Sequence, residues 1–174
     1  MAVSASCALT TDYTFGCDKS VGGVKTFWLI ELDNVSSIGE SSGMITAITK
    51  AGGKVFRKYQ LVLETSSTVE AITGNRQNGT LYYAQTATMI INRQQVAVRN
   101  EILLIAKNNL ILISEDNAGD WRMYGRENGL VLTGGEAASG VAWADRNGYT
   151  LTLTGNEFEL APFVSEAVIA TLQT

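Results

Sequence analysis

A chain of 174 residues, of which 45% are hydrophobic and 17% charged, is large enough for one globular domain with a substantial core. Its formal net charge is −4, and a nucleic-acid-binding protein, which needs Lys and Arg to neutralise phosphates, does not fit that balance. The sequence contains no histidine, so Ser-His-Asp and Cys-His catalytic centres and His-containing zinc sites are excluded.

The first half of the chain has the residue pattern of β-strands. β-branched and aromatic residues dominate three segments, which are "VKTFWLIEL" (Val24–Leu32), "MITAIT" (Met44–Thr49) and "VFRKYQLVLET" (Val55–Thr65). Further on, "GNRQNG" separates two strand-like runs and predicts a long hairpin over Thr68–Ile91. Neither face of its second arm is purely polar, so we expect both faces to be at least partly covered.

The periodicity changes from that of a strand to that of a helix at Asn92. Asn92, with Gln95 three positions later, fits a capping box and predicts a helix over Asn92–Asn109. We expect its sheet-facing stripe to contain Val96, Ile102, Leu103, Ala106 and Leu110.

Closely spaced hairpin signals follow the helix. "LILISE" is expected to turn through "DNAGD" into "WRMYG", and Asn-Gly pairs at Asn78, Asn128 and Asn147 predict tight turns. "TGGEAASG" is interpreted as a mobile loop, because it lacks the Gly-Lys-Ser/Thr of a phosphate loop and leads into no helix. Pro162 marks the end of the last strand, and the segment beyond it fits either a short helix or an extended arm. The predicted fold is mainly β, an antiparallel β-sandwich or barrel with one flanking α-helix.

No group of residues in the sequence has the spacing of a catalytic or metal site. "EDNAGD" (Glu115–Asp120) lacks the spacing of an EF-hand, so an acidic hairpin turn is favoured over a calcium site. Glu157 and Glu159 alternate along a strand, and a solvated edge is favoured over a glycosidase pair. Cys7 and Cys17 are interpreted as reduced thiols, with pairing in an oxidising compartment as the alternative. We therefore expect no catalytic residues, no metal and no cofactor.

Tryptophans are scattered along the sequence rather than clustered. For Trp28, Trp121 and Trp143 we expect packing in a core or an interface.

Four segments carry a family resemblance, over about residues 55–163. They are "GNRQNGTLYYAQT", "RQQVAVRNEILLIAKNN", "LILISEDNAGDWRMYGRENGLVLT" and "DRNGYTLTLTGNEFELAPF". Together they resemble tail-tube-like structural virion proteins of tailed bacteriophages, notably the ring proteins of the neck and tail in crAss-like phages. The resemblance rests on the order of hairpin, single helix, acidic turn and final strand.

The resemblance implies a protein that assembles into hexameric or dodecameric rings around a DNA channel. Its partners would be further copies of itself and neighbouring tail or neck proteins. Genomic DNA would pass through without specific binding, and no membrane would be involved. The implied location is the virion, after assembly in the cytoplasm of the host bacterium.

We expect one domain over residues 1–174, with an N-terminal segment at 1–22 and a C-terminal arm at 163–174 that order on neighbouring subunits. The expected subunit interface lies on the hairpin, at Thr73, Asn75, Arg76, Asn78, Tyr82 and Tyr83. The alternative is a non-enzymatic β-sandwich module that binds a protein or a carbohydrate. A small hydrolase that uses carboxylates is a weaker hypothesis, because the sequence lacks histidine.

Overall fold

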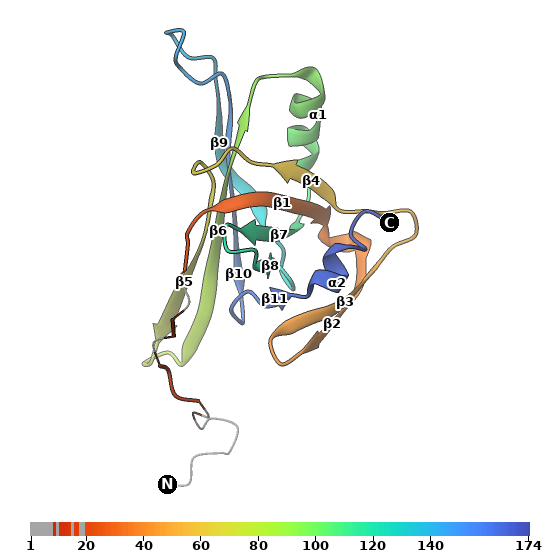
Figure 1. Cartoon of the computed structure of the whole chain (residues 1–174), viewed down its shortest axis with the longest axis vertical. Helices are drawn as coiled ribbons and strands as arrows, with labels where there is room; N and C mark the ends of the chain where they lie inside the picture. The colour runs from red at the N-terminus through yellow and green to blue at the C-terminus, as the bar shows by residue number, and fades with distance from the viewer. Residues whose placement is uncertain (1–8, 10, 15, 18–19) are drawn as a thin grey trace.

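The computed structural model describes residues 9, 11–14, 16–17 and 20–174, and consists mainly of two packed β-sheets (Figure 1). The seven-stranded sheet has the order β2 (Val35–Ser41), β3 (Met44–Lys50), β11 (Phe163–Val164), β8 (Trp121–Tyr124), β7 (Leu110–Asp116), β1 (Val24–Glu31) and β4 (Arg57–Gln60). The four-stranded sheet has the order β5 (Ser67–Asn75), β6 (Thr80–Asn92), β10 (Gly148–Glu157) and β9 (Val131–Ala138). The helices are α1 (Val96–Ile105) and the single turn α2 (Glu166–Ile169), with a 3-10 turn at Leu32–Asn34. The prediction of a mainly β sandwich with a flanking helix is confirmed, and the barrel alternative is not realised.

The central strands β1 and β7 are buried on both faces, which explains their continuous apolar sequences. Phe27 and Leu29 of β1 belong to the core between the two sheets, together with Met89 and Leu153 of the four-stranded sheet. The alternate residues of β1, such as Trp28, belong to a second core on the other face of the seven-stranded sheet. Because successive side chains of a strand point to opposite faces, a strand covered on both sides has no polar face.

The C-terminal segment fills this second core of its own chain. Val168 and Leu172 are 4% and 1% exposed there, and the Phe56 N–H donates to the Leu172 carbonyl over 3.0 Å. The Lys50 Nζ donates to the carbonyl oxygens of Thr171, Leu172 and Thr174, over 2.6, 3.1 and 2.9 Å. The expectation that residues 163–174 lie outside the compact core is therefore corrected, because their apolar side chains find cover within the chain. The corresponding prediction for the N-terminus falls partly outside the described residues.

Helix α1 is shorter than predicted and presents a different face to the sheet. It begins at Val96 with Gln95 as N-cap, and no side-chain capping hydrogen bond is formed. Asn92 is instead the last residue of β6, paired with Gly148, and Arg93 has a φ of 68°. The capping-box prediction is wrong because the β6–β10 ladder holds Asn92 in an extended conformation.

The apolar stripe predicted for the helix is also corrected. Ile105 is 4% exposed and Ile102 packs against the core between the sheets, whereas Val96 is 77% exposed and Leu103 46% exposed. Ile102 and Ile105, three residues apart, share the face that packs on the core, and Leu103 lies about 100° round the helix from Ile102, at the surface.

The segment "TGGEAASG" contributes most of strand β9, which corrects the prediction of a loop. A Cβ atom on Gly135 would lie 2.6 Å from the Thr150 carbonyl oxygen, so the glycine permits close approach of β10. The β9–β10 register also shifts between Thr152 and Leu153, and glycine is common at such bulges.

Other strand boundaries differ from the prediction. Strand β2 was not expected, and β4 covers only part of the segment Val55–Thr65. The Asn78–Gly79 turn is confirmed, whereas Asn128–Gly129 lies in the connection from β8 to β9, between the two sheets. Asn147–Gly148 lies at the start of β10 and is not itself the turn of a two-residue hairpin.

The four-stranded sheet carries a loop at each end of its long axis. The β5–β6 turn lies beyond the Asn75–Thr80 pair, at the lower end in Figure 1. The β9–β10 connection, residues 139–147, lies beyond the Ala138–Gly148 pair at the upper end. Since Gly148 also pairs with Asn92 at the far end of β6, the register places these two loops at opposite ends of one sheet.

Candidate subunit interface

The six residues predicted as an interface lie together on the β5–β6 hairpin. The register pairs Thr73 with Tyr82, and Ile72 with Tyr83. Every residue from Ala71 to Tyr82 is exposed, so this end of the hairpin extends beyond the region where the two sheets cover each other. The structure therefore places Thr73, Asn75, Arg76, Asn78, Tyr82 and Tyr83 in one part of the molecule; whether a neighbour contacts them stays a prediction.

The turn of this hairpin is ordered by its own side chains. The Asn75 Oδ1 accepts hydrogen bonds from the backbone N–H of Gln77 at 2.9 Å and of Asn78 at 3.2 Å. Gly79 has a φ of 64°, a conformation that glycine adopts without strain. The polar residues of "GNRQNG" thus build the turn, and Arg76 remains as the one charged side chain between Ala71 and Tyr82.

At its base the hairpin is joined to the rest of the fold through buried polar groups. Gln85, which is 2% exposed, donates through Nε2 to Glu70 Oε1 at 2.9 Å. Its Oε1 accepts the N–H of Gly125 at 2.8 Å, and Glu70 Oε1 also accepts the N–H of Ala161 at 2.8 Å. These bonds connect both strands of the hairpin to segments that lead out of β8 and into β11. They fix the direction in which the exposed end projects.

The exposed end of the hairpin is apolar on both faces. Val69 is 57% exposed, Ile72 65%, Leu81 56% and Tyr82 39%. Leu81 shares a face with the buried residues Gln85 and Ala87, but it lies beyond the part of the sheet that the core covers. The interface residues predicted from the sequence are polar and aromatic, and they do not include these aliphatic ones. The mixed polarity of both faces was the signal that could have identified them.

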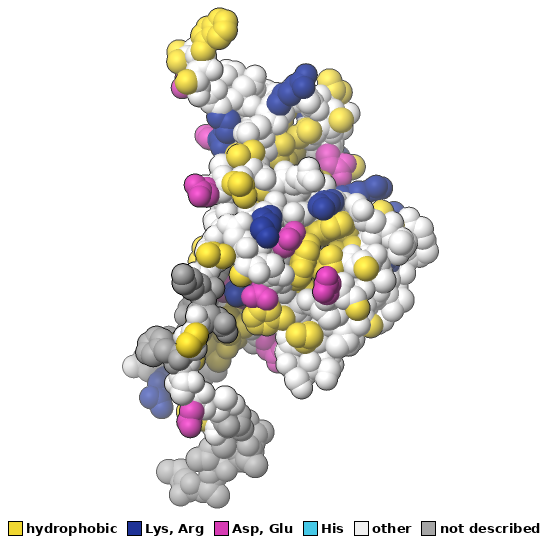
Figure 2. Space-filling view, in the orientation of Figure 1, with side chains coloured by type: hydrophobic (Ala, Val, Ile, Leu, Met, Phe, Trp, Pro, Cys, Tyr) yellow, Lys and Arg dark blue, Asp and Glu magenta, His cyan; other side chains and the backbone are white. Residues whose placement is uncertain are grey.

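The opposite end of the sheet also exposes apolar side chains, on the loop at residues 139–147. Val141 and Trp143 are fully exposed, and Figure 2 shows hydrophobic side chains on this projecting tip at the top of the view. The Asp145 carboxylate accepts the N–H of Val141 at 2.8 Å and of Ala142 at 2.7 Å. The hydrogen bonds from Ala142 and Val141 lower the pKa of Asp145. The loop is therefore ordered by its own hydrogen bonds. Trp143 was expected to pack in a core or in an interface, and its exposure rules out the core.

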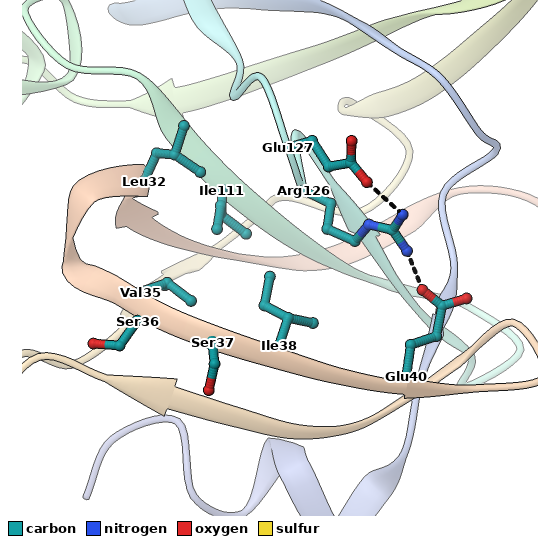
Figure 3. Close-up of a pocket in the computed structure, with 9 residues that line it drawn as sticks. All are labelled: Leu32, Val35, Ser36, Ser37, Ile38, Glu40, Ile111, Arg126 and Glu127. Atoms are coloured by element: carbon teal, nitrogen blue, oxygen red, sulfur yellow. Dashed lines mark hydrogen bonds and ion pairs between the residues drawn. The ribbon is translucent and has the colours of Figure 1, made fainter.

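A concave site lies between β2 and the segment after β8, with a volume of about 440 Å³ (Figure 3). Its Arg126 guanidinium forms ion pairs with Glu40, with Glu127 at 2.8 Å and with Glu159 at 3.4 Å. Partial burial lowers the pKa of Arg126, but the hydrogen bond to Glu127 and the three carboxylates together raise it above its ordinary value. The guanidinium joins three segments of the fold and stays charged.

The remaining carboxylates considered in the sequence have separate roles. Glu157 is 5% exposed and accepts the N–H of Asn128 at 2.9 Å, so the expected solvated edge is wrong for this residue. Glu159 is exposed and binds Arg126. Asp116 and Asp120 lie in the β7–β8 turn, where the Asp116 carboxylate accepts the Asp120 N–H at 2.9 Å, as an acidic hairpin turn requires. Within the described residues, no group of three or more Cys, Asp and Glu is arranged to hold a metal ion.

The cysteines and the helices add no further site. Cys7 lies outside the described residues and Cys17 is exposed, so their pairing is untested. No helix in the described ranges has the length and apolar character needed to cross a bilayer. Comparisons with protein families, curated proteins and solved structures found no significant match to this chain.

Proposed function

We propose that this chain is a structural virion protein that assembles with further copies of itself into a ring or tube of a phage tail or neck, as part of the DNA-ejection channel. The observation that carries the proposal is the exposed, apolar end of the β5–β6 hairpin. Full burial of a large aliphatic side chain contributes roughly 1.5–3 kcal/mol. Three of these side chains are more than half exposed, namely Val69, Ile72 and Leu81. Covering all three would contribute about 3 kcal/mol to each contact between two subunits.

The edges of the four-stranded sheet support contacts that close a ring. β5 and β9 are its outer strands, and each pairs with one strand among the described residues. An edge strand offers free backbone N–H and C=O groups to another chain. Because the two edges differ, β5 of one copy could pair with β9 of the next, and a repeated contact of this heterologous type closes a ring or builds a tube.

The outer face of the same sheet fits the wall of a DNA channel. It carries the residues that alternate with the buried ones, among them Thr86, Thr88, Thr150, Thr152 and Thr154. Glu136 of β9 is the one charged residue at these outward positions of the four strands. The Arg146 guanidinium, from the adjoining loop, reaches this face, where it donates to Thr150 at 2.6 Å and pairs with Glu136 at 3.7 Å. A face with so little unpaired positive charge offers few neutralising partners to phosphates, so DNA would pass without being held.

The test is the size of the purified chain, measured by sedimentation velocity and electron microscopy over a range of concentrations. We expect rings or tubes for the wild type and a large loss of assembly for Leu81→Asp. Gln77→Asp is the matched control, because it adds the same charge at the exposed turn without removing an apolar side chain. A wild type that stays monomeric at every concentration would contradict the proposal and favour a binding module. Portal, capsid and terminase genes beside this gene are expected independently.

A further inference from the structure

Three Asn-Gly pairs in this chain differ in how the fold holds them. They are Asn78–Gly79 in the β5–β6 turn, Asn128–Gly129 after β8 and Asn147–Gly148 at the start of β10. Asn-Gly is prone to spontaneous loss of the asparagine amide, because a glycine without a Cβ atom hinders attack by its own backbone nitrogen least. All three pairs share this chemistry, and the structure decides which of them can react.

The reaction requires two rotations at the asparagine. The glycine nitrogen must approach the Cγ atom of the asparagine side chain, so the side chain turns about χ1 and the following peptide group turns about ψ. Both rotations are opposed where the side-chain amide or the asparagine carbonyl is hydrogen-bonded, and where the glycine is buried. The state of these groups therefore decides the rate at each pair.

At the β5–β6 turn these groups are unrestrained. Asn78 and Gly79 are both exposed. In the described part of the chain, no hydrogen bond engages the Asn78 side chain, the Asn78 carbonyl or the Gly79 N–H. The Asn78 N–H donates to Asn75 Oδ1 at 3.2 Å, on the other side of the Asn78 Cα atom. That bond restrains φ and leaves ψ and χ1 free to turn.

The Asn128–Gly129 pair is held through the asparagine side chain. The Asn128 Nδ2 donates to the Asn156 carbonyl at 2.8 Å, and the Asn128 N–H donates to Glu157 Oε1 at 2.9 Å. Gly129 is buried, and a Cβ atom there would lie 2.9 Å from the Asn109 Cβ, so the peptide group has little room to turn. Reaction at Asn128 therefore requires local opening of the structure.

The Asn147–Gly148 pair is held through the backbone. The Asn147 carbonyl accepts the Arg93 N–H at 2.6 Å, and rotation about ψ of Asn147 would break that bond. Gly148 is buried and pairs with Asn92 of β6 and Ala138 of β9. Reaction at Asn147 therefore requires loss of one end of the β6–β10 ladder.

We propose that Asn78 is a site of spontaneous deamidation in the folded chain, through a succinimide ring formed with Gly79. The Gly79 nitrogen bonds to the Asn78 Cγ, the Cγ–Nδ2 bond breaks, and the amide leaves as ammonia with the proton of the Gly79 N–H. Water then adds to either carbonyl carbon of the ring, which opens to aspartate or to isoaspartate. The reaction consumes only water, and no atom is oxidised or reduced.

The modification changes both the charge and the backbone of the hairpin end. The new carboxylate balances Arg76, which is the one charged side chain between Ala71 and Tyr82. The isoaspartate product also routes the main chain through the former side chain and lengthens the turn by one carbon. Both changes require only a free copy of the chain, so they do not depend on the proposed assembly.

The test is peptide mapping by mass spectrometry during incubation of the full-length chain at mildly alkaline pH. The concentration is kept where sedimentation velocity shows single copies. Trypsin cleaves after Arg76, Arg126 and Arg146, so each Asn-Gly pair falls in a separate peptide. Conversion of the amide to a carboxyl changes the peptide mass, and electron-transfer fragmentation separates aspartate from isoaspartate. Asn78→Gln is the control, because glutamine closes the corresponding ring much more slowly and the exposed position tolerates it.

We expect the Asn78 peptide to convert roughly tenfold or more faster than the peptides of Asn128 and Asn147, because those two sites must first break hydrogen bonds. In urea all three should convert at similar rates, since the fold then holds none of them. The peptide of the Asn78→Gln variant should stay unconverted. Equal rates in the folded chain would overturn the proposal, and so would an Asn78 peptide that stays intact while the unfolded chain converts.

Discussion

Replacement of Gln85 by leucine tests the polar connection at the base of the hairpin. The wild-type amide accepts the Gly125 N–H at 2.8 Å and donates to Glu70 at 2.9 Å, in a site that is 2% exposed. An orphaned buried N–H costs about 1–3 kcal/mol, and loss of a hydrogen bond to a charged group costs about 1.5–3 kcal/mol. Glu70 keeps its bond from Ala161, and an added apolar side chain returns about 1 kcal/mol, so we expect a net loss of about 2 kcal/mol.

Urea unfolding followed by tryptophan fluorescence measures this loss. In a chain of this length 2 kcal/mol corresponds to a decrease of about 4–8 °C in Tm. Gln77→Leu is the control, because Gln77 lies in the exposed turn, and its stability should stay within about 0.5 kcal/mol of the wild type. A change of less than about 0.5 kcal/mol for Gln85→Leu would refute the view that this amide fixes the hairpin.

The variant Gln85→Glu adds a pH signature to the same test. It keeps an acceptor for Gly125 but places a second carboxyl beside Glu70, and this raises the folded-state pKa of the new group above its unfolded value of about 4.3. A group with a raised pKa is favourable in its protonated form, so the destabilisation should be small below about pH 4 and should grow as the pH rises above it. Equal destabilisation relative to the wild type at pH 4 and pH 7 would contradict this.

Two further predictions concern the helix and the upper loop. Ile105→Asp should abolish cooperative unfolding, because a buried charge costs several kcal/mol. Leu103→Asp should change Tm by only a few degrees, because Leu103 is about half exposed. An equal loss of stability in the two variants would contradict the observed orientation of α1. Asp145→Ala should loosen the loop at residues 139–147 and sharpen the NMR signals of Val141 and Ala142. In the wild type those amide shifts should move with a pKa below 3.8, because the carboxylate that binds them is present above that pKa and is lost as the pH falls through it. A titration at or above 3.8 would contradict the hydrogen bonds.

The parts of the fold that depend on neighbouring residues could be predicted from the sequence. The β5–β6 hairpin was predicted within a residue or two, because "GNRQNG" contains both the Asn75 side-chain cap and the glycine that the turn needs. The β7–β8 hairpin was also predicted, because "DNAGD" has the residues of an acidic turn. Local hydrogen bonds decide these structures, and local sequence encodes them.

The parts that depend on distant segments could not be predicted. "TGGEAASG" reads as a loop until β10 is placed beside it, because the close approach of Thr150 to Gly135 is a tertiary contact. The start of α1 also depends on a distant segment, because pairing with Gly148 of β10 keeps Asn92 in strand β6 and out of the helix. A groove lies between α1 and β9 and is built from both of these segments, so it could not be predicted from the sequence.

The proposed assembly agrees with which groups of this fold have partners and which do not. Several ionisable groups have partners within the chain: Arg126 binds three carboxylates, and Glu157 accepts the backbone N–H groups of Glu127 and Asn128. The Nε atoms of Arg122 and Arg146, by contrast, are buried without a hydrogen-bond partner among the described residues. In the part of the chain that the structure describes, backbone is also left open along the edges of β5 and β9, as are apolar side chains at the two ends of one sheet. Strand edges and apolar surface are the groups that a second protein chain can satisfy, and a small polar substrate cannot. Because these groups lie at opposite ends, a copy that contacts one neighbour through one end keeps its other end free for a second neighbour, as a growing ring or tube requires.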